Sequence, residues 1–167
     1  MLYAIGYNRW PAKQRLERML AVLQNAHIDI VVDVRLSPSS SQSSPHSNYG
    51  PRPWHLLAQG AGLDGHLRHE GIEYAWLPEL GNPQKSSGNT EILQAHLADG
   101  SLRVPVNRGL IVLKDLIDSG KSCCLLCACG KYDQCHRKVI AEAFNERFFG
   151  GKLEIKDLSM LMDILLT

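Results

Sequence analysis

Five cysteines fall within one short stretch of the chain, and a histidine and an arginine directly follow the last of them. The cysteines are Cys123, Cys124, Cys127, Cys129 and Cys135. An odd number of crowded cysteines makes a poor disulfide framework, which leaves packing, metal ligation or thiol chemistry as their roles. Cys135 begins a predicted helix, where unpaired N–H groups favour a thiolate and so a reactive cysteine. The alternative for Cys135 is a small buried hydrophobic residue.

The spacing of these cysteines differs from that of common zinc sites. Cys127-x-Cys129-x₅-Cys135 lacks the paired C-x₂-C units of a zinc ribbon. Neighbouring Cys135 and His136 also point about 100° apart on a helix. We therefore expect no metal and no cofactor, with a cysteine-based metal or redox site as an alternative. A Cys-x₅-Arg phosphate loop is absent, because Asp133 and Cys135 stand six residues after Cys127 and Cys129.

His136 and Arg137 lie on a helix with a defined apolar face. Val139, Ile140, Ala143 and Phe144 centre this face close to His136, so we expect the imidazole to point toward the sheet. His136 is then either a buried histidine bonded to a carbonyl or carboxylate, or an acid/base group or ligand. Arg137 lies at the edge of the face, where it could pair with Asp33 or Glu79, or hold a phosphate or carboxylate.

Asp33-Val34-Arg35 places two opposite charges on one side of a strand end, because residues i and i+2 share a face. They either pair with each other or face a pocket in which Arg35 binds an anion and Asp33 orients it.

The chain alternates predicted strands and helices. Apolar and β-branched runs predict strands at 2–5, 30–32, 72–77 and 122–127, and helical periodicity predicts helices at 16–23, 90–98, 105–119 and 135–149. Residues 37–53 are predicted to form a long exposed loop and 54–59 a short helix, whereas 152–167 are not assigned. This pattern indicates an α/β fold with a mostly parallel sheet flanked by helices.

In open parallel sheets, ligands bind beyond the carboxyl ends of the strands. We therefore expect the residues that follow the strands to meet in one pocket. The catalytic candidates are His136, Cys135, Cys127, Asp33 and Glu79, and the substrate-binding candidates are Arg35, Arg137, Gly6, Tyr7, Asn8 and Gly81.

Length and composition fit a single domain over residues 1–167. The chain is 44% hydrophobic and carries 18 basic and 17 acidic residues, a net charge of +1. A nearly neutral chain has no general field that attracts nucleic acid or anionic membranes. No leader peptide or membrane-spanning run is visible, so we expect a soluble, cytoplasmic protein without a membrane partner. An anionic small molecule or nucleic acid is the expected partner, and the oligomeric state does not follow from the sequence.

The chain resembles the DUF488 family of uncharacterised proteins. The residues that carry this resemblance are Ile5–Asn8, Val32–Arg35 with Pro38, Tyr74 with Leu77–Gly81, Leu125–Cys129, and Cys135–Arg137 with Ile140-Ala141. The resemblance implies a compact α/β fold, an unassigned activity and a loose association with nucleic-acid processing. Two positions depart from the family's pattern: Asn8 replaces a usual Ser or Thr, and Cys129 stands where relatives often have an acidic residue.

The sequence is compatible with three functions. The first is an enzyme that acts on a phosphate-bearing or nucleic-acid substrate through the strand-end pocket. The second is a binding module that recognises such an anion without turnover. The third is a metal or redox site built on the cysteines.

Overall fold

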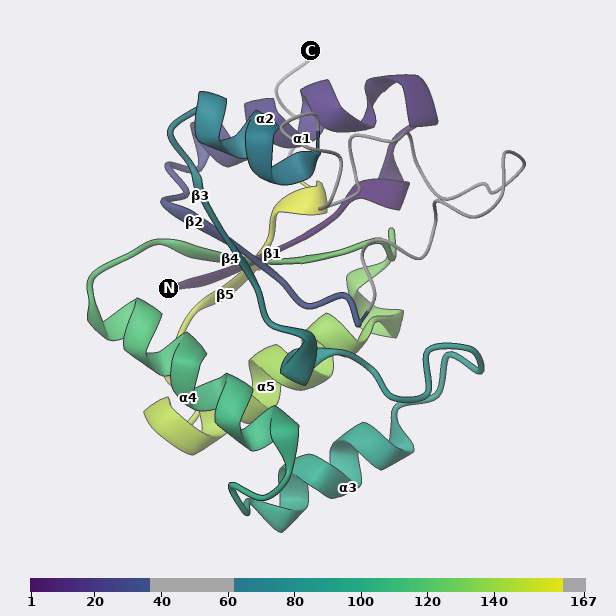
Figure 1. Ribbon diagram of the computed structural model, residues 1–167, viewed down its shortest axis with the longest axis vertical. Coiled ribbons are helices and arrows are strands. Elements are labelled where there is room, and N and C mark those ends of the chain that lie inside the picture. Colours follow the sequence, from purple (N-terminus) through teal and green to yellow (C-terminus); the bar gives the residue numbers. More distant parts are fainter. Residues whose placement is uncertain (37–61, 161–167) are drawn as a thin grey trace.

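A single parallel β-sheet forms the middle of the molecule. The computed structural model describes residues 1–36 and 62–160. The sheet has the strand order β3-β2-β4-β1-β5, and every pairing between these strands is parallel. The strands are β1 (Leu2–Gly6), β2 (Ile30–Asp33), β3 (Glu73–Trp76), β4 (Cys123–Cys127) and β5 (Ile155–Asp157). Strand β4 lies at the centre and is buried along its whole length (Figure 1).

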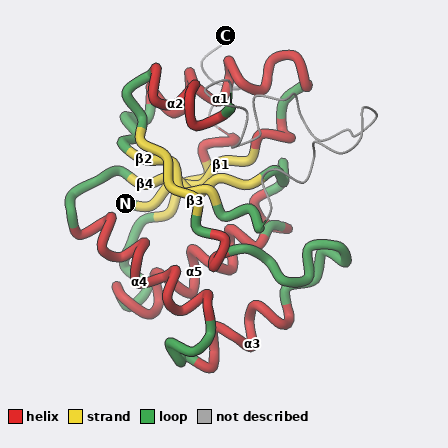
Figure 2. Tube along the Cα trace, viewed as in Figure 1, coloured by secondary structure: helices red, strands yellow, loops and turns green. Residues whose placement is uncertain are grey.

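Helices cover both faces of the sheet (Figures 1 and 2). Helices α1 (Arg15–Asn25) and α2 (Leu63–His69) lie on one face. Helices α4 (Pro105–Asp118) and α5 (His136–Phe149) lie on the other, and α3 (Glu91–Asp99) packs against α4. Successive residues of a strand point to opposite faces, so Leu125 faces α4 and α5, whereas Leu126 faces α1 and α2. This arrangement confirms the predicted α/β class.

Most predicted elements are present with small shifts at their ends. The predicted helix at 105–119 is α4, and Gly120 follows it with a φ of 87°, as expected of a glycine that ends a helix. Two elements were missed. Helix α2 contains only two fully apolar buried positions, Leu63 and Leu67, and begins after Gly62, so its periodic signal is short. Strand β5 has three residues and pairs only with β1.

Several expectations concern residues outside the described ranges. The predicted loop at 37–53 and helix at 54–59 lie there, as does the end of the unassigned tail, 161–167. Among residues 1–36 and 62–160, no helix is both long enough and apolar enough to span a bilayer.

The strand order creates a change of direction at the centre of the sheet. The chain leaves β1 through α1 on one face, and leaves β4 through α5 on the opposite face. Because β1 and β4 are neighbours, a crevice is expected between the loops that follow them. Gly6 and Cys127 are register partners at this position, and the Asn8 amide donates to the Ala128 carbonyl at 3.0 Å. The fold therefore points to the ends of β1 and β4 as the place for a site.

The core under α5 offers a test of the packing. Phe144 is fully buried and its ring lies 5.2 Å from that of Phe148 and 5.6 Å from that of Phe149. We predict that Phe144→Ala lowers the free energy of unfolding by about 3–5 kcal/mol, because it removes a large apolar group and leaves a cavity. Ile111→Ala, at a position of α4 that is 39% exposed, should cost about 0.5 kcal/mol or less. Urea unfolding measures both, and equal losses would contradict the assignment of the core.

Candidate functional site

The residues expected to share one pocket form two groups on opposite faces of the sheet edge. Cys127, Cys129, Cys135 and His136, here called the thiol cluster, lie on the α5 face. Tyr7, Asp33, Arg35 and Tyr74, here called the aspartate network, lie on the α1 and α2 face. The division follows from strand alternation, because Asp33 and Arg35 point to one face and Val34 between them to the other.

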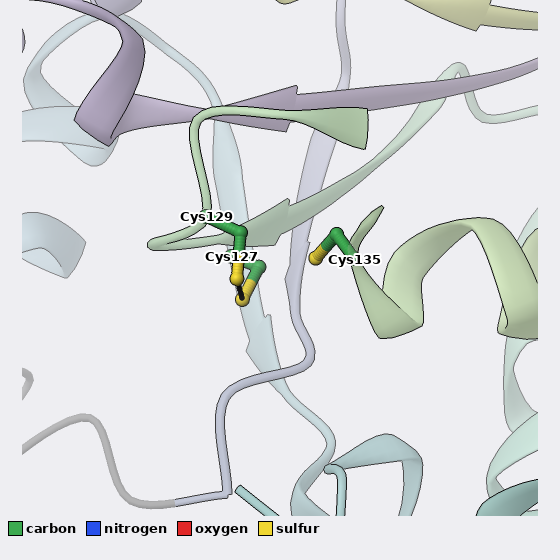
Figure 3. Close-up of side chains that lie close together, drawn as sticks. All are labelled: Cys127, Cys129 and Cys135. Atoms are coloured by element: carbon green, nitrogen blue, oxygen red, sulfur yellow. Dashed lines mark hydrogen bonds between the residues drawn. The ribbon is translucent and has the colours of Figure 1, made fainter. Parts of the chain in front are cut away.

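Three different elements supply the thiol cluster (Figure 3). Cys127 is the last residue of β4, and Cys129 lies two residues farther on in the loop. Cys135 directly precedes α5 with an extended backbone, at φ −108° and ψ 144°, and His136 is the first residue of the helix. A strand end, a loop and a helix start therefore converge.

The distances within the thiol cluster are short. The sulfurs of Cys127 and Cys129 are 3.8 Å apart, and those of all three cysteines lie within 4.8 Å of one another. His136 Nδ1 lies 3.9 Å from the Cys127 sulfur and 3.8 Å from the Cys135 sulfur. One imidazole nitrogen thus faces two thiols at once.

A backbone contact fixes the orientation of His136. Its Nε2 lies 3.0 Å from the carbonyl oxygen of Val34. A carbonyl oxygen only accepts hydrogen bonds, so Nε2 carries the proton and donates it. The side chain is buried, with 8% exposed. The predicted inward orientation of His136 is confirmed, and the residue that it bonds directly follows β2.

Arg137 lies beneath the thiol cluster with no exposed surface. Its Nε donates to the Cys135 sulfur at 3.3 Å and its Nη2 to the carbonyl oxygen of Cys129 at 2.9 Å. Its Nη1 is buried without a hydrogen-bond partner among the described residues. The expected pairing of Arg137 with Asp33 or Glu79 is wrong, because α5 directs the guanidinium toward the loop after β4.

Gly6 makes room for this guanidinium. A Cβ at Gly6 would lie 1.8 Å from the carbonyl oxygen of Cys129, and 2.6 and 2.9 Å from the two Nη atoms of Arg137. No side chain fits there, so the candidate residue Gly6 contributes to the site through the absence of a side chain.

Hydrogen bonds within the thiol cluster shift the pKa values of its members. Bonds from Cys127 and Cys129 lower the pKa of Cys135 against the effect of burial, and His136 and Arg137 lower it further. Burial, the largest single effect on His136, lowers its pKa, but the two neighbouring sulfurs together raise the pKa to about 10. The cluster thus favours a thiolate beside a cationic imidazole. In contrast, burial raises the pKa of Cys123, a core residue of β4, to about 11.

Hydrogen bonds join the four residues of the aspartate network to one another. Arg35 donates from Nε to both Asp33 oxygens, at 2.9 and 3.0 Å, and from Nη2 to Oδ2 at 2.5 Å. The Tyr74 hydroxyl donates to Oδ2 at 2.6 Å, and Arg35 Nη1 donates to the Tyr7 hydroxyl at 3.2 Å. Burial and the Asp33 carboxylate raise the pKa of Tyr74. The predicted pairing of Asp33 with Arg35 is present, and it occupies most of the guanidinium.

Besides Gly6 and Arg137, which border the thiol cluster, three candidate residues lie outside both groups. Glu79 is exposed on the 3₁₀ turn Pro78–Leu80 and takes part in no hydrogen bond among the described residues. Gly81 passes close to the chain at Leu36, where a Cβ would lie 2.8 Å from the Leu36 Cα. Asn8 is exposed and joins the loop after β4 through its backbone only. The expectation of one pocket for all the candidates is therefore wrong.

Two members of the site, Cys129 and Tyr74, were not among the predicted catalytic and substrate-binding residues. Cys129 follows Cys127 by two residues after a strand end, and this spacing was judged only against the zinc ribbon. Tyr74 is an aromatic residue of β3, and its hydroxyl reaches Asp33 on the neighbouring strand. Alternation along the two strands, which puts Tyr74 and Asp33 on one face, could have indicated it.

A polar cleft of about 470 Å³ borders the thiol cluster. It lies between the start of α3 and the start of α5, and Cys135 is part of its wall. Lys138 also lines it and pairs with Asp133 at 3.0 Å.

Comparison with known proteins places the chain in a family. The family model described as "Domain of unknown function DUF488" matches residues 52–144, more than half of the chain. The protein belongs to the DUF488 family. The matched segment of this DUF488 protein contains the whole thiol cluster, Arg137 and Tyr74, whereas Gly6, Asp33 and Arg35 precede it. No curated protein and no solved structure matches the sequence significantly.

The close approach at Gly6 leads to a prediction. Replacing a strand glycine with alanine often stabilises a protein, because it restricts the unfolded chain. Here the new methyl group would overlap the Cys129 carbonyl and displace Arg137. We expect Gly6→Ala to lower the free energy of unfolding by about 1–3 kcal/mol, as measured by urea unfolding. An unchanged or higher stability would show that the loop after β4 adapts freely.

The aspartate network leads to a second prediction. Tyr74→Phe removes a donor from a fully buried carboxylate. A hydrogen bond to a charged group contributes about 1.5–3 kcal/mol, so we expect a loss of that size. Tyr3→Phe in β1 is the matched control, because the Tyr3 hydroxyl takes part in no hydrogen bond of the described residues, and it should change stability by less than about 0.5 kcal/mol. Thermal unfolding of the two variants decides the point.

Proposed function

We propose that the thiol cluster of this DUF488 protein is a metal centre that binds one zinc ion through Cys127, Cys129, Cys135 and Nδ1 of His136. The observation that carries the proposal is the convergence of three sulfurs within 4.8 Å of one another, with the imidazole Nδ1 of His136 within 3.9 Å of two of them. Three cysteines and one histidine are a common ligand set of tetrahedral zinc.

Three separations within the thiol cluster are close to the edges of a zinc tetrahedron. Zinc binds sulfur at about 2.3 Å and nitrogen at about 2.0–2.1 Å, which places ligand atoms about 3.5–3.8 Å apart. The Cys127 and Cys129 sulfurs are 3.8 Å apart, and the two contacts of His136 Nδ1 are 3.8 and 3.9 Å. Small side-chain rotations would bring the four atoms around one ion.

The surroundings of the ligands also support a metal. A histidine that binds zinc usually donates its other ring N–H to a carbonyl or carboxylate, as His136 does to Val34. Three thiolates, a neutral imidazole and Zn²⁺ carry a net charge of −1. The buried guanidinium of Arg137, bonded to the Cys135 sulfur, supplies the compensating positive charge.

Two features of the sequence argued against zinc: the missing C-x₂-C pairs, and the angle between neighbouring Cys135 and His136 on a helix. The local backbone at these residues is compatible with a zinc site in spite of both. Cys127 belongs to a strand end and Cys135 precedes its helix with an extended backbone, so the pair does not need the geometry of a zinc ribbon. The side chains of Cys135 and His136 leave the backbone in different directions, so they could bind the same ion from different sides.

Anion binding by Arg35 and Arg137 receives less support. Both guanidiniums are buried, and both donate to groups of their own chain. They also belong to groups on opposite faces of the sheet. An anion would have to displace Asp33 from Arg35 before it could bind there.

Elemental analysis tests the metal centre. We predict about one zinc per chain in protein purified under reducing conditions without chelator. Cys135→Ser should retain less than about a fifth of that zinc, because it removes a ligand whose thiolate Arg137 stabilises. Cys123→Ala, which removes a cysteine of the same region from the core, should retain it.

The stability of the protein provides a second readout. A strong chelator should lower the midpoint of thermal unfolding of the wild type and of Cys123→Ala, and leave that of Cys135→Ser nearly unchanged. Wild-type protein without zinc or another transition metal, even after refolding in the presence of zinc, would refute the proposal.

A further inference from the structure

We propose that Cys129 is the reactive ligand of this metal centre, and that its zinc-bound thiolate accepts an alkyl group from a soft carbon electrophile. Cys127, Cys135 and His136 would hold the ion during this reaction. The inference rests on the proposed zinc site and adds a chemical activity to it.

Exposure distinguishes Cys129 from the other ligands. Cys129 is exposed, whereas Cys127 and Cys135 have 6% and 3% of their surface exposed and His136 has 8%. Cys129 lies in the loop after β4, while the other ligands are held by a strand end and by the start of a helix. Among the four ligands, Cys129 is therefore the one most accessible to a molecule from solution.

Hydrogen bonding distinguishes the same ligand. Arg137 donates from Nε to the sulfur of Cys135, which stabilises that thiolate and lowers its nucleophilicity. Toward Cys129, the same guanidinium donates to the backbone carbonyl oxygen and not to the sulfur. Arg137 thus fixes the position of the loop, and within residues 1–36 and 62–160 no cationic side chain donates to the Cys129 sulfur.

Zinc supplies the thiolate at neutral pH. A thiol bound to zinc is deprotonated outright, whereas a free cysteine with a pKa of about 8.5 is mostly protonated. In the reaction, a lone pair of the Cys129 sulfur forms the S–C bond. The bond between carbon and the leaving group breaks, and the leaving group departs with the electron pair. The step needs neither a proton nor an oxidant, and its product is a thioether at Cys129.

The dependence of alkylation on pH tests the inference. Zinc-loaded wild-type protein is treated with iodoacetamide at pH 6 and at pH 8, and the modified residue is identified by peptide mass mapping. We expect Cys129 to be labelled first, at rates that differ by less than about twofold between the two pH values. A free thiol of ordinary pKa would react about 75-fold faster at pH 8.

Zinc content, measured on the same samples, separates the two proposals. One zinc per chain together with a Cys129 rate that rises about 75-fold, or with equal labelling of Cys127, Cys129 and Cys135, would refute the reactive thiolate and leave the metal centre standing. Absence of zinc would refute the metal centre and the inference with it. Cys129→Ser should abolish the early label, and Cys123→Ala should leave it unchanged.

Discussion

A fully buried guanidinium holds the candidate site together. Arg137 bonds the Cys135 sulfur at the start of α5 and the Cys129 carbonyl in the loop after β4, and it lies against Gly6 at the end of β1. A buried positive charge is costly unless nearby groups compensate it. Its Nη1 has no partner among the described residues, so negative charge on the adjacent sulfurs is the main compensation available. The thiolate character of the cluster and the burial of Arg137 therefore depend on each other.

The order of the strands explains why this happens at β1 and β4. These neighbouring strands lead to helices on opposite faces, and the loops that follow them meet at the site, where the Asn8 amide donates to the Ala128 carbonyl. The alternation of side chains along an extended backbone explains the separation of the two residue groups. The segment that contributes Asp33 and Arg35 to one face brings the Val34 carbonyl near the other group, and that carbonyl orients His136. The aspartate network secures the backbone at the end of β2, directly before Val34.

The proposed metal centre agrees with the distribution of charge around it. The overall charge of the chain is close to zero, so no general field attracts an anionic partner. Locally, one arginine offsets the single negative charge of a zinc ion with three thiolates and one imidazole. Within such a centre, the ligand that lies in the loop and lacks a cationic donor is the one left to react. Cys127, Cys135 and His136 would thus hold the ion, and Cys129 would be the ligand that reacts.

The sequence by itself determined where most helices and strands lie and which side of a helix faces the sheet. Periodicity located β1, β2, β3 and β4 and helices α1, α3, α4 and α5 to within a few residues, and helix phasing turned His136 toward the sheet, because these signals depend on neighbours within a few positions. Helix α2 and strand β5 escaped because each is too short to show a period.

Only the tertiary structure decided which of the candidate residues meet. The contact between His136 and Val34 joins residues 102 positions apart, and Gly6 meets Cys127 through a pairing of distant strands. Contacts of this kind depend on which strands are neighbours and on which face of the sheet a side chain lies. Local sequence patterns do not encode the order of the strands. For this reason the sequence named most of the residues of the site, while the fold separated them into two groups and added Cys129 and Tyr74.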